Sequence, residues 1–63
     1  MKKQFVIIYT YRCVDDTIDN GKITVSLDRD FKETKKNTEK LTRILEARLK
    51  LPELKIHGII GID

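Results

Sequence analysis

Acidic and amide side chains cluster in residues 15–21, and their spacing partly matches a calcium-binding loop. Asp16, Asn20 and Gly21 fall on the first, fifth and sixth places of an EF-hand loop. The third place holds an isoleucine and the twelfth a leucine, so two oxygen ligands are missing, including the bidentate glutamate. We therefore expect no metal site, and this stretch is predicted to form the polar turn of a hairpin.

The other residues with catalytic chemistry are one thiol, Cys13, and one imidazole, His57. A nucleophile pair would require the first and last segments of the chain to be neighbours. Cys13 alternates with Phe5, Ile7 and Tyr9 along an apolar segment, where a small buried thiol is the commoner role. The sequence therefore predicts no catalytic residue, no cofactor and no enzymatic activity.

Basic side chains are concentrated in one segment of the chain. Residues 1–31 hold five basic and five acidic side chains, whereas residues 32–50 hold seven basic and three acidic ones, a local charge of +4. Such an excess is either the solvated face of a helix or a surface for an acidic partner. The residues that we expect to contact a partner protein are Lys35, Lys36, Lys40, Arg43 and Lys50.

The same basic segment is also the candidate for contacts with DNA or RNA phosphates. Glu33, Glu39 and Glu46 are interleaved with the basic residues and would repel a nucleic-acid backbone. Tyr9 and Tyr11 are spaced like the stacking aromatics of RNA-binding sheets, but the glycine-rich aromatic signature of those sheets is absent. Nucleic-acid binding is therefore the alternative to protein binding.

The length and composition indicate a single small domain, residues 1–63, that needs further stabilisation. A domain of this size buries only about 60% of the surface that its unfolded chain exposes. A single cysteine excludes an internal disulfide, so a homodimer is the expected supplement. A lone cysteine also favours a reducing compartment, the cytoplasm. The apolar run near the start is far shorter than the roughly 18 residues of a membrane span, so no membrane association is expected.

Two strands are predicted before the basic segment. Residues 4–14 are rich in β-branched and aromatic side chains and are apolar on both faces near their start, which is typical of a central strand. Residues 22–28 alternate strictly, with Ile23, Val25 and Leu27 on one face. The polar second face of this segment indicates an edge strand that is exposed to water on one side.

The hydrophobic period then changes to that of a helix. Asp30 followed by Glu33 fits a capping box, although Asp28 or Thr34 fits the N-cap position as well. Pro52 ends the helix near residues 50–51. The predicted apolar stripe, extended towards the start by Phe31, Thr34 and Thr38, consists of Leu41, Ile44, Leu45 and Leu49.

After Pro52, apolar residues at alternate positions continue almost to the last residue, which predicts a third strand. The fold class is therefore α+β, a β-β-α-β domain with a mainly antiparallel sheet in which the first strand lies between the second and the third. The helix covers one face of this sheet. We expect Val6, Ile8 and Ile59 on the other face, as an exposed patch, a sheet-edge contact or a dimer contact.

In size and element order the chain resembles small phage and mobile-element proteins that bind a host enzyme and block or redirect it. The resemblance covers the whole chain and implies an inhibitor-like interaction protein. It involves no shared motif, so no functional residue follows from it. Together with the basic segment, it leads us to expect a small non-enzymatic module that binds an acidic protein surface.

Overall fold

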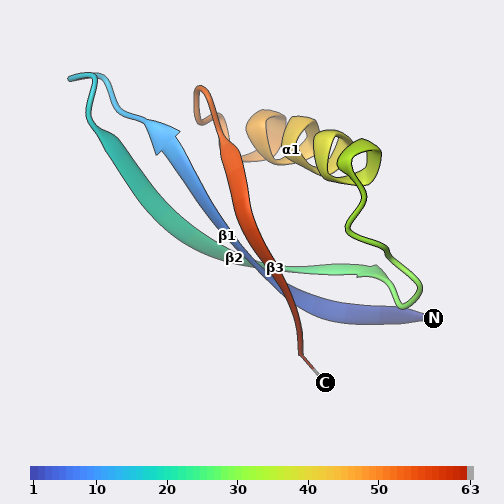
Figure 1. The fold of residues 1–63 in the computed structure, drawn as a ribbon. Coiled ribbons are helices and arrows are strands. Elements are labelled where there is room, and N and C mark those ends of the chain that lie inside the picture. The colour runs from blue at the N-terminus through green and yellow to red at the C-terminus, as the bar shows by residue number, and fades with distance from the viewer. Residues whose placement is uncertain (63) are drawn as a thin grey trace.

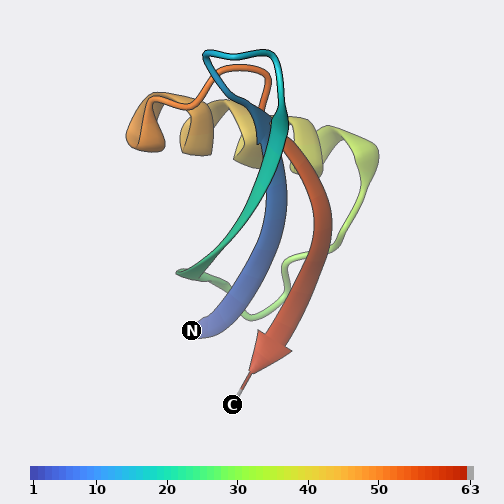
Figure 2. The ribbon, with the colours of Figure 1, turned by 90° about the vertical axis from the view of Figure 1, so that its left-hand side faces the viewer.

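A computed structural model describes residues 1–62 and shows the α+β fold that the sequence predicts (Figure 1). The element order is β1 (Lys2–Arg12), β2 (Ile18–Asp28), α1 (Lys35–Leu49) and β3 (Lys55–Ile62). Both strand pairs are antiparallel, and the strand order is β2-β1-β3. The sheet curves strongly, with α1 on its concave side (Figures 1 and 2).

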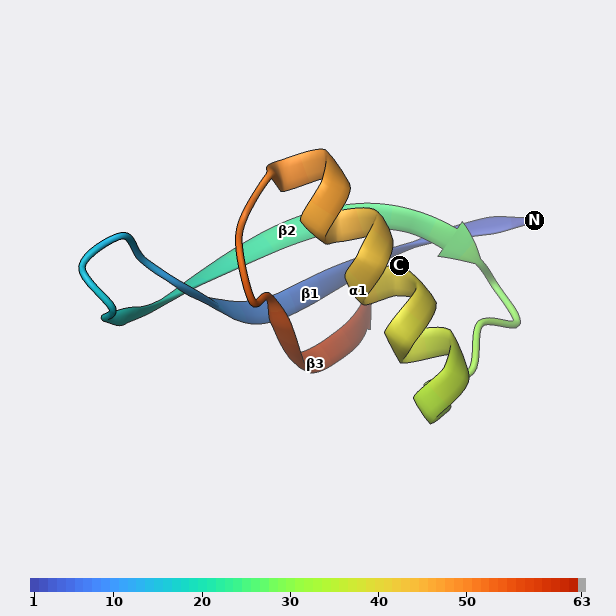
Figure 3. The same ribbon diagram turned by 90° about the horizontal axis from the view of Figure 1, so that it is seen from above.

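The core lies between α1 and the central strand. Phe5, Ile7 and Tyr9 alternate along β1 and are buried, and Leu41 and Leu45 of α1 are buried with them. The alternation places these β1 side chains on a single face of the sheet, which the apolar stripe of α1 covers. Viewed from above, α1 crosses the sheet obliquely and the hairpin turn projects beyond it (Figure 3).

The hairpin turn is shorter than the sequence predicted, because β2 begins at Ile18 and the turn spans only residues 13–17. Asp16 takes the left-handed conformation at φ 65°, and the Thr17 hydroxyl donates to Asp15 Oδ1 at 2.6 Å. Backbone hydrogen bonds from the Cys13 N–H to the Thr17 carbonyl and from the Asp16 N–H to the Cys13 carbonyl close this short turn, so residues 18–21 join the β ladder.

Gly21 thus lies in a strand and not in the turn. It pairs with Tyr9 of β1, and a Cβ atom built on it would lie 2.6 Å from the Tyr9 hydroxyl. A glycine is needed here because the tyrosine ring lies across the strand, and not because the backbone requires positive φ. Further along β2, the alternation holds as predicted, and the half-buried side chains that pack against the core are those of Ile23, Val25 and Leu27.

The helix begins at Lys35, at the latest of the three starts that the sequence allows. Thr34 is the N-cap, and its side-chain oxygen accepts a hydrogen bond from the Asn37 N–H at 3.2 Å. Asp28 instead serves the preceding turn, because its Oδ1 accepts from the Asp30 N–H at 3.1 Å. The helix ends at Leu49, followed by a left-handed residue, Lys50, two residues before Pro52.

The predicted apolar stripe of α1 is wrong at Ile44, and its predicted extension is wrong at Thr34, which is the exposed N-cap. Leu41, Leu45 and Leu49 pack in or against the core, but 59% of Ile44 is exposed. The stripe that the sheet can cover is narrower than the sequence pattern, so Ile44 lies at its edge.

A β-bulge changes which face the side chains of β3 occupy. Ile8 pairs with Gly58 and Tyr9 with Ile56, so His57 is an extra residue on β3. Before the bulge, Leu54 and Ile56 lie towards the helix. After it, Ile59 lies towards the helix and Ile60 lies on the open face. The prediction of one continuous alternation through β3 is therefore wrong.

Candidate protein-binding surfaces

The five basic residues predicted to bind a partner are all exposed on or beside α1. Lys36 and Arg43 lie two helical turns apart on the side opposite the buried leucines, with Lys40 one turn beyond Lys36. Lys35 lies in the first turn, and Lys50 caps the helix at its C-terminus, where positive charge is favourable. The structure therefore brings four of the five to one helix and places the fifth at its end.

The charges of this surface are not neutralised within the described part of the chain. In residues 1–62, the ion pairs within 4.0 Å join Arg12 to Asp16 and to Glu53, at the hairpin end of the sheet. None of the five basic residues forms an ion pair or a side-chain hydrogen bond in the same range. Their ammonium and guanidinium groups face solvent.

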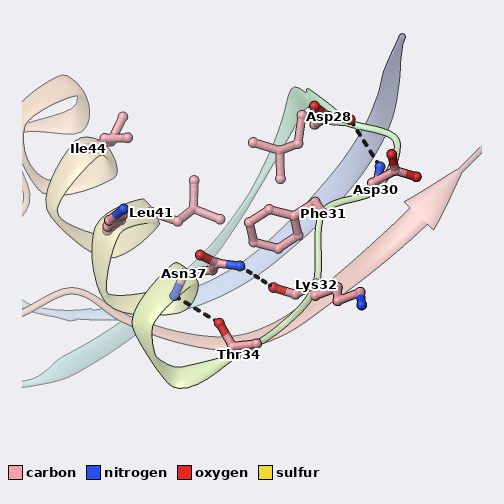
Figure 4. Close-up of a pocket in the computed structure, with 10 residues that line it drawn as sticks. Asp28, Asp30, Phe31, Lys32, Thr34, Asn37, Leu41 and Ile44 are labelled. Atoms are coloured by element: carbon pink, nitrogen blue, oxygen red, sulfur yellow. Dashed lines mark hydrogen bonds between the residues drawn. The ribbon is translucent and has the colours of Figure 1, made fainter.

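A groove lies along one side of α1, between the helix and the loop that follows β2 (Figure 4). Its volume is about 430 Å³. Leu27, Phe31, Leu41 and Ile44 supply its apolar surface, and Lys40 lines it as well. Phe31 projects from the loop towards Leu41 (Figure 4).

The loop wall of this groove is held in place by hydrogen bonds. The Asn37 side-chain amide donates to the Lys32 carbonyl at 2.9 Å, and the Phe31 N–H donates to the Asp28 carbonyl at 2.9 Å. The Phe31 ring also packs edge-on against Phe5, with 6.0 Å between the ring centroids. The groove is therefore formed before any partner arrives. Sequence reasoning missed it because the period of the helix assigned Ile44 to the core.

The open face of the sheet carries a second apolar patch. Val6 and Ile8 are half-buried there, and they pair with Ile60 and Gly58 of β3. Ile60 is 51% exposed and Ile62 is 41% exposed. Ile59, predicted to share this face, instead pairs with Ile7 and packs against the core. The bulge at His57 thus replaces Ile59 by two other isoleucines on the open face.

Cys13 and His57 do not form a hydrogen-bonded pair. His57 Nε2 lies 2.8 Å from the Thr10 hydroxyl, whereas Cys13 lies in the hairpin turn and its backbone N–H donates to the Thr17 carbonyl. A hollow of about 520 Å³ lies beside His57, but Arg12 and Glu53 in its wall are ion-paired with each other. Four of its polar side chains are therefore engaged in two pairs, Thr10 with His57 and Arg12 with Glu53, and Lys55 in the same wall is exposed.

Two side chains near the hairpin turn, Tyr11 and Asp15, have shifted pKa values. The Asp19 carboxylate beside Tyr11 raises the pKa of that phenol above its ordinary value. Hydrogen bonds from the Thr17 hydroxyl and N–H lower the pKa of Asp15. Asp15 is exposed, whereas Tyr11 is half-buried and packs against the core. Among residues 1–62, no cluster of three or more His, Cys, Asp or Glu side chains is placed to hold a metal ion.

Comparison with known proteins does not assign the chain to a family. No protein-family model matches it, and neither the curated proteins nor the solved structures gave a significant match. Within the described residues, α1 is too short and too polar to span a bilayer.

Proposed function

We propose that this chain is a non-enzymatic interaction module that binds an acidic surface on another protein through the outer side of α1. The observation that carries the proposal is the row of exposed cations, without internal ion pairs in residues 1–62, centred on Lys36, Lys40 and Arg43. A preformed apolar groove beside that row supports the same function. By its resemblance to small phage and mobile-element proteins, the chain would inhibit or redirect the protein that it binds.

Binding is favoured over catalysis by the placement of the reactive groups. Cys13 lies in the hairpin turn and does not contact His57, whose Nε2 is hydrogen-bonded to the Thr10 hydroxyl in the hollow that Thr10 and His57 both line. Within residues 1–62, no third side chain is hydrogen-bonded to the His57 ring, as the orienting group of a nucleophile–base pair would be. The free thiol of Cys13 fits a reducing cytoplasm.

The proposal is tested by affinity capture from the source cells followed by mass spectrometry. The bait is the wild-type chain, the triple variant K36A/K40A/R43A or a control triple variant, K2A/K22A/K55A. The control removes three exposed lysines from the strands, so both variants lose the same charge. We expect the same captured protein with wild type and control and its loss with the α1 variant. Equal capture by all three baits would contradict the proposal.

The alternative is binding of nucleic acid through the same side of α1, favoured by the +4 charge of residues 32–50. A gel shift with non-specific duplex and single-stranded DNA, at low and at physiological salt, tests this alternative. Micromolar binding with a steep salt dependence, weakened in K36A/K40A/R43A but not in K2A/K22A/K55A, would favour nucleic acid over a protein partner.

We further propose a homodimer that covers the open face of the sheet. The exposed side chains of Ile60 and Ile62, next to Val6 and Ile8, support this contact. The monomer mass is 7.4 kDa. Analytical ultracentrifugation at high micromolar concentration should therefore give about twice that value, and Ile60→Lys should restore the monomer. A monomer mass for the wild-type chain would contradict the dimer.

A further inference from the structure

The outer side of α1 and the groove beside it form one continuous surface. Residues four positions apart lie on one ridge of a helix. One such ridge of α1 consists of Lys36, Lys40, Ile44 and Arg48, and all four side chains are exposed. Lys40 and Ile44 also line the groove. An exposed isoleucine therefore lies between cations at the mouth of an apolar hollow.

The fold does not require this isoleucine to be apolar. Leu41 and Leu45 fill the contact with the sheet, and 59% of Ile44 remains in water. Together with Phe31 and Leu27 it gives the groove an apolar surface, and a volume of about 430 Å³ lies in the range of roughly 300–1,000 Å³ that ligand sites commonly have. The hollow has room for a large side chain of a partner.

The charges around the groove differ between its two walls. On the helix side, Lys36, Lys40 and Arg48 follow the ridge. The loop side carries charges of both signs, Asp28, Asp30 and Lys32, and the Asp28 carboxylate already accepts a hydrogen bond from the Asp30 N–H. The helix wall therefore attracts the carboxylates of a partner more strongly than the loop wall does, because the charge of Lys32 on the loop wall is offset by the two aspartates.

We propose that the groove binds an acidic amphipathic segment of the partner protein, which inserts a leucine, phenylalanine or methionine between Phe31 and Ile44 while its carboxylates contact Lys36, Lys40 and Arg48. This inference rests on the proposed function and deepens it, because it names the chemistry of the partner. Apolar side chains in a groove with charged neighbours are the usual mode by which amphipathic helices are recognised.

Titrations with three synthetic helical peptides of about 15 residues test the inference. The first carries a stripe of leucine among glutamates, the second has serine in place of leucine, and the third has glutamine in place of glutamate. Amide and methyl NMR shifts of the isotope-labelled protein report both the affinity and the place of binding. We expect the first peptide to perturb Phe31, Leu41 and Ile44 and to bind at least about tenfold more tightly than either of the others.

Variants of the protein give the matching control. Ile44→Ser should weaken binding of the Leu/Glu peptide at least about tenfold, and Ile44→Met should retain it. Val14→Ser removes an equally branched but fully exposed side chain at the hairpin turn and should leave the affinity unchanged. The amide spectrum of each variant shows whether it is folded.

Each remaining outcome would overturn the inference in a distinguishable way. Equal binding of the Leu/Glu and Ser/Glu peptides on α1 would overturn the groove contact and leave the proposed function standing. Equal affinity for the Leu/Glu and Leu/Gln peptides would overturn the predicted contacts between carboxylates and the cations of α1, because the groove would then bind apolar side chains without regard to charge. If the NMR signals of the groove residues shift with protein concentration in the absence of peptide, the groove is occupied by a second copy of this chain. No binding of any peptide at millimolar concentration would count against the inference and the proposed function together.

Discussion

The two sides of α1 differ in how much the fold depends on them: the inner side carries the buried leucines, and the outer side carries the exposed cations. On the inner side, Leu41 and Leu45 are buried against Ile7 and Tyr9, and the fold depends on this contact. On the outer side, Lys36, Lys40 and Arg43 form no ion pair with the described residues, so we expect the fold to gain little from them. The difference shows that the sheet and the inner stripe account for folding, whereas the exposed outer side of α1 can be changed without loss of the core.

The largest expected effect comes from the inner side. Leu45 is 1% exposed, so Leu45→Ala should lower the free energy of unfolding by about 2–5 kcal/mol through lost burial and a new cavity. Urea denaturation followed by circular dichroism measures the change. On the outer side, Arg43→Ala should change it by less than about 0.5 kcal/mol. Similar losses for both variants would remove the distinction between the two sides.

The sheet beneath the inner side offers a matched pair of glycines. Gly21→Ala would place a Cβ 2.6 Å from the Tyr9 hydroxyl, whereas the nearest neighbour of a Cβ at Gly58 lies 3.8 Å away. Because Tyr9 is buried and its ring cannot move freely, Gly21→Ala should destabilise the fold by about 1–3 kcal/mol. Gly58→Ala should have little effect in the same urea titration. A larger destabilisation by Gly58→Ala than by Gly21→Ala would show that the Tyr9 ring does not lie across β2.

A smaller effect is expected at the start of α1. Thr34→Ala removes the acceptor of the Asn37 N–H and should cost about 1 kcal/mol, measured by thermal or urea unfolding. Asp30→Ala is the control, because the sequence favours it as an N-cap but the structure places it in the preceding turn. A larger loss for Asp30→Ala than for Thr34→Ala would place the helix start earlier than residue 35.

The smallest effect is a pH dependence at the hairpin turn, away from both sides of α1. The pKa of Asp15 is below its ordinary value of 3.8 because the ionised carboxylate accepts hydrogen bonds from Thr17. Its contribution to stability is therefore fully present above that value and is lost as the pH falls through the lowered pKa. The difference in unfolding free energy between wild type and Asp15→Asn should be constant above about pH 5 and shrink in more acidic solution. A pH-independent difference would contradict this assignment.

Periodicity predicted the fold because it reports local burial. The two apolar faces of residues 4–14 predicted the central strand, and the alternation of Ile23, Val25 and Leu27 predicted an edge strand. The change of period after residue 30 predicted the helix. They could not predict the bulge at His57, because a bulge depends on the register with β1 and not on the sequence of β3 alone. For that reason the assignment of Ile59 to the open face was wrong.

The candidate surface was predicted only in part. The exposure of Lys36, Lys40 and Arg43 follows from their spacing relative to the leucines. The groove depends on the loop after β2, which folds back so that Phe31 faces the helix, and such a tertiary contact leaves no periodic signal. One sequence signal could have indicated the groove. The apolar stripe of the helix, which includes Ile44, is wider than the sheet can cover.

The outer side of α1 is tested most directly by two measurements on one variant, K36A/K40A/R43A. Its free energy of unfolding should stay within about 0.5 kcal/mol per substitution of the wild-type value. Its affinity for the Leu/Glu peptide should fall at least about tenfold, while K2A/K22A/K55A keeps the wild-type affinity at the same ionic strength. An unchanged affinity in the α1 variant, or an equal loss in the control, would contradict the account.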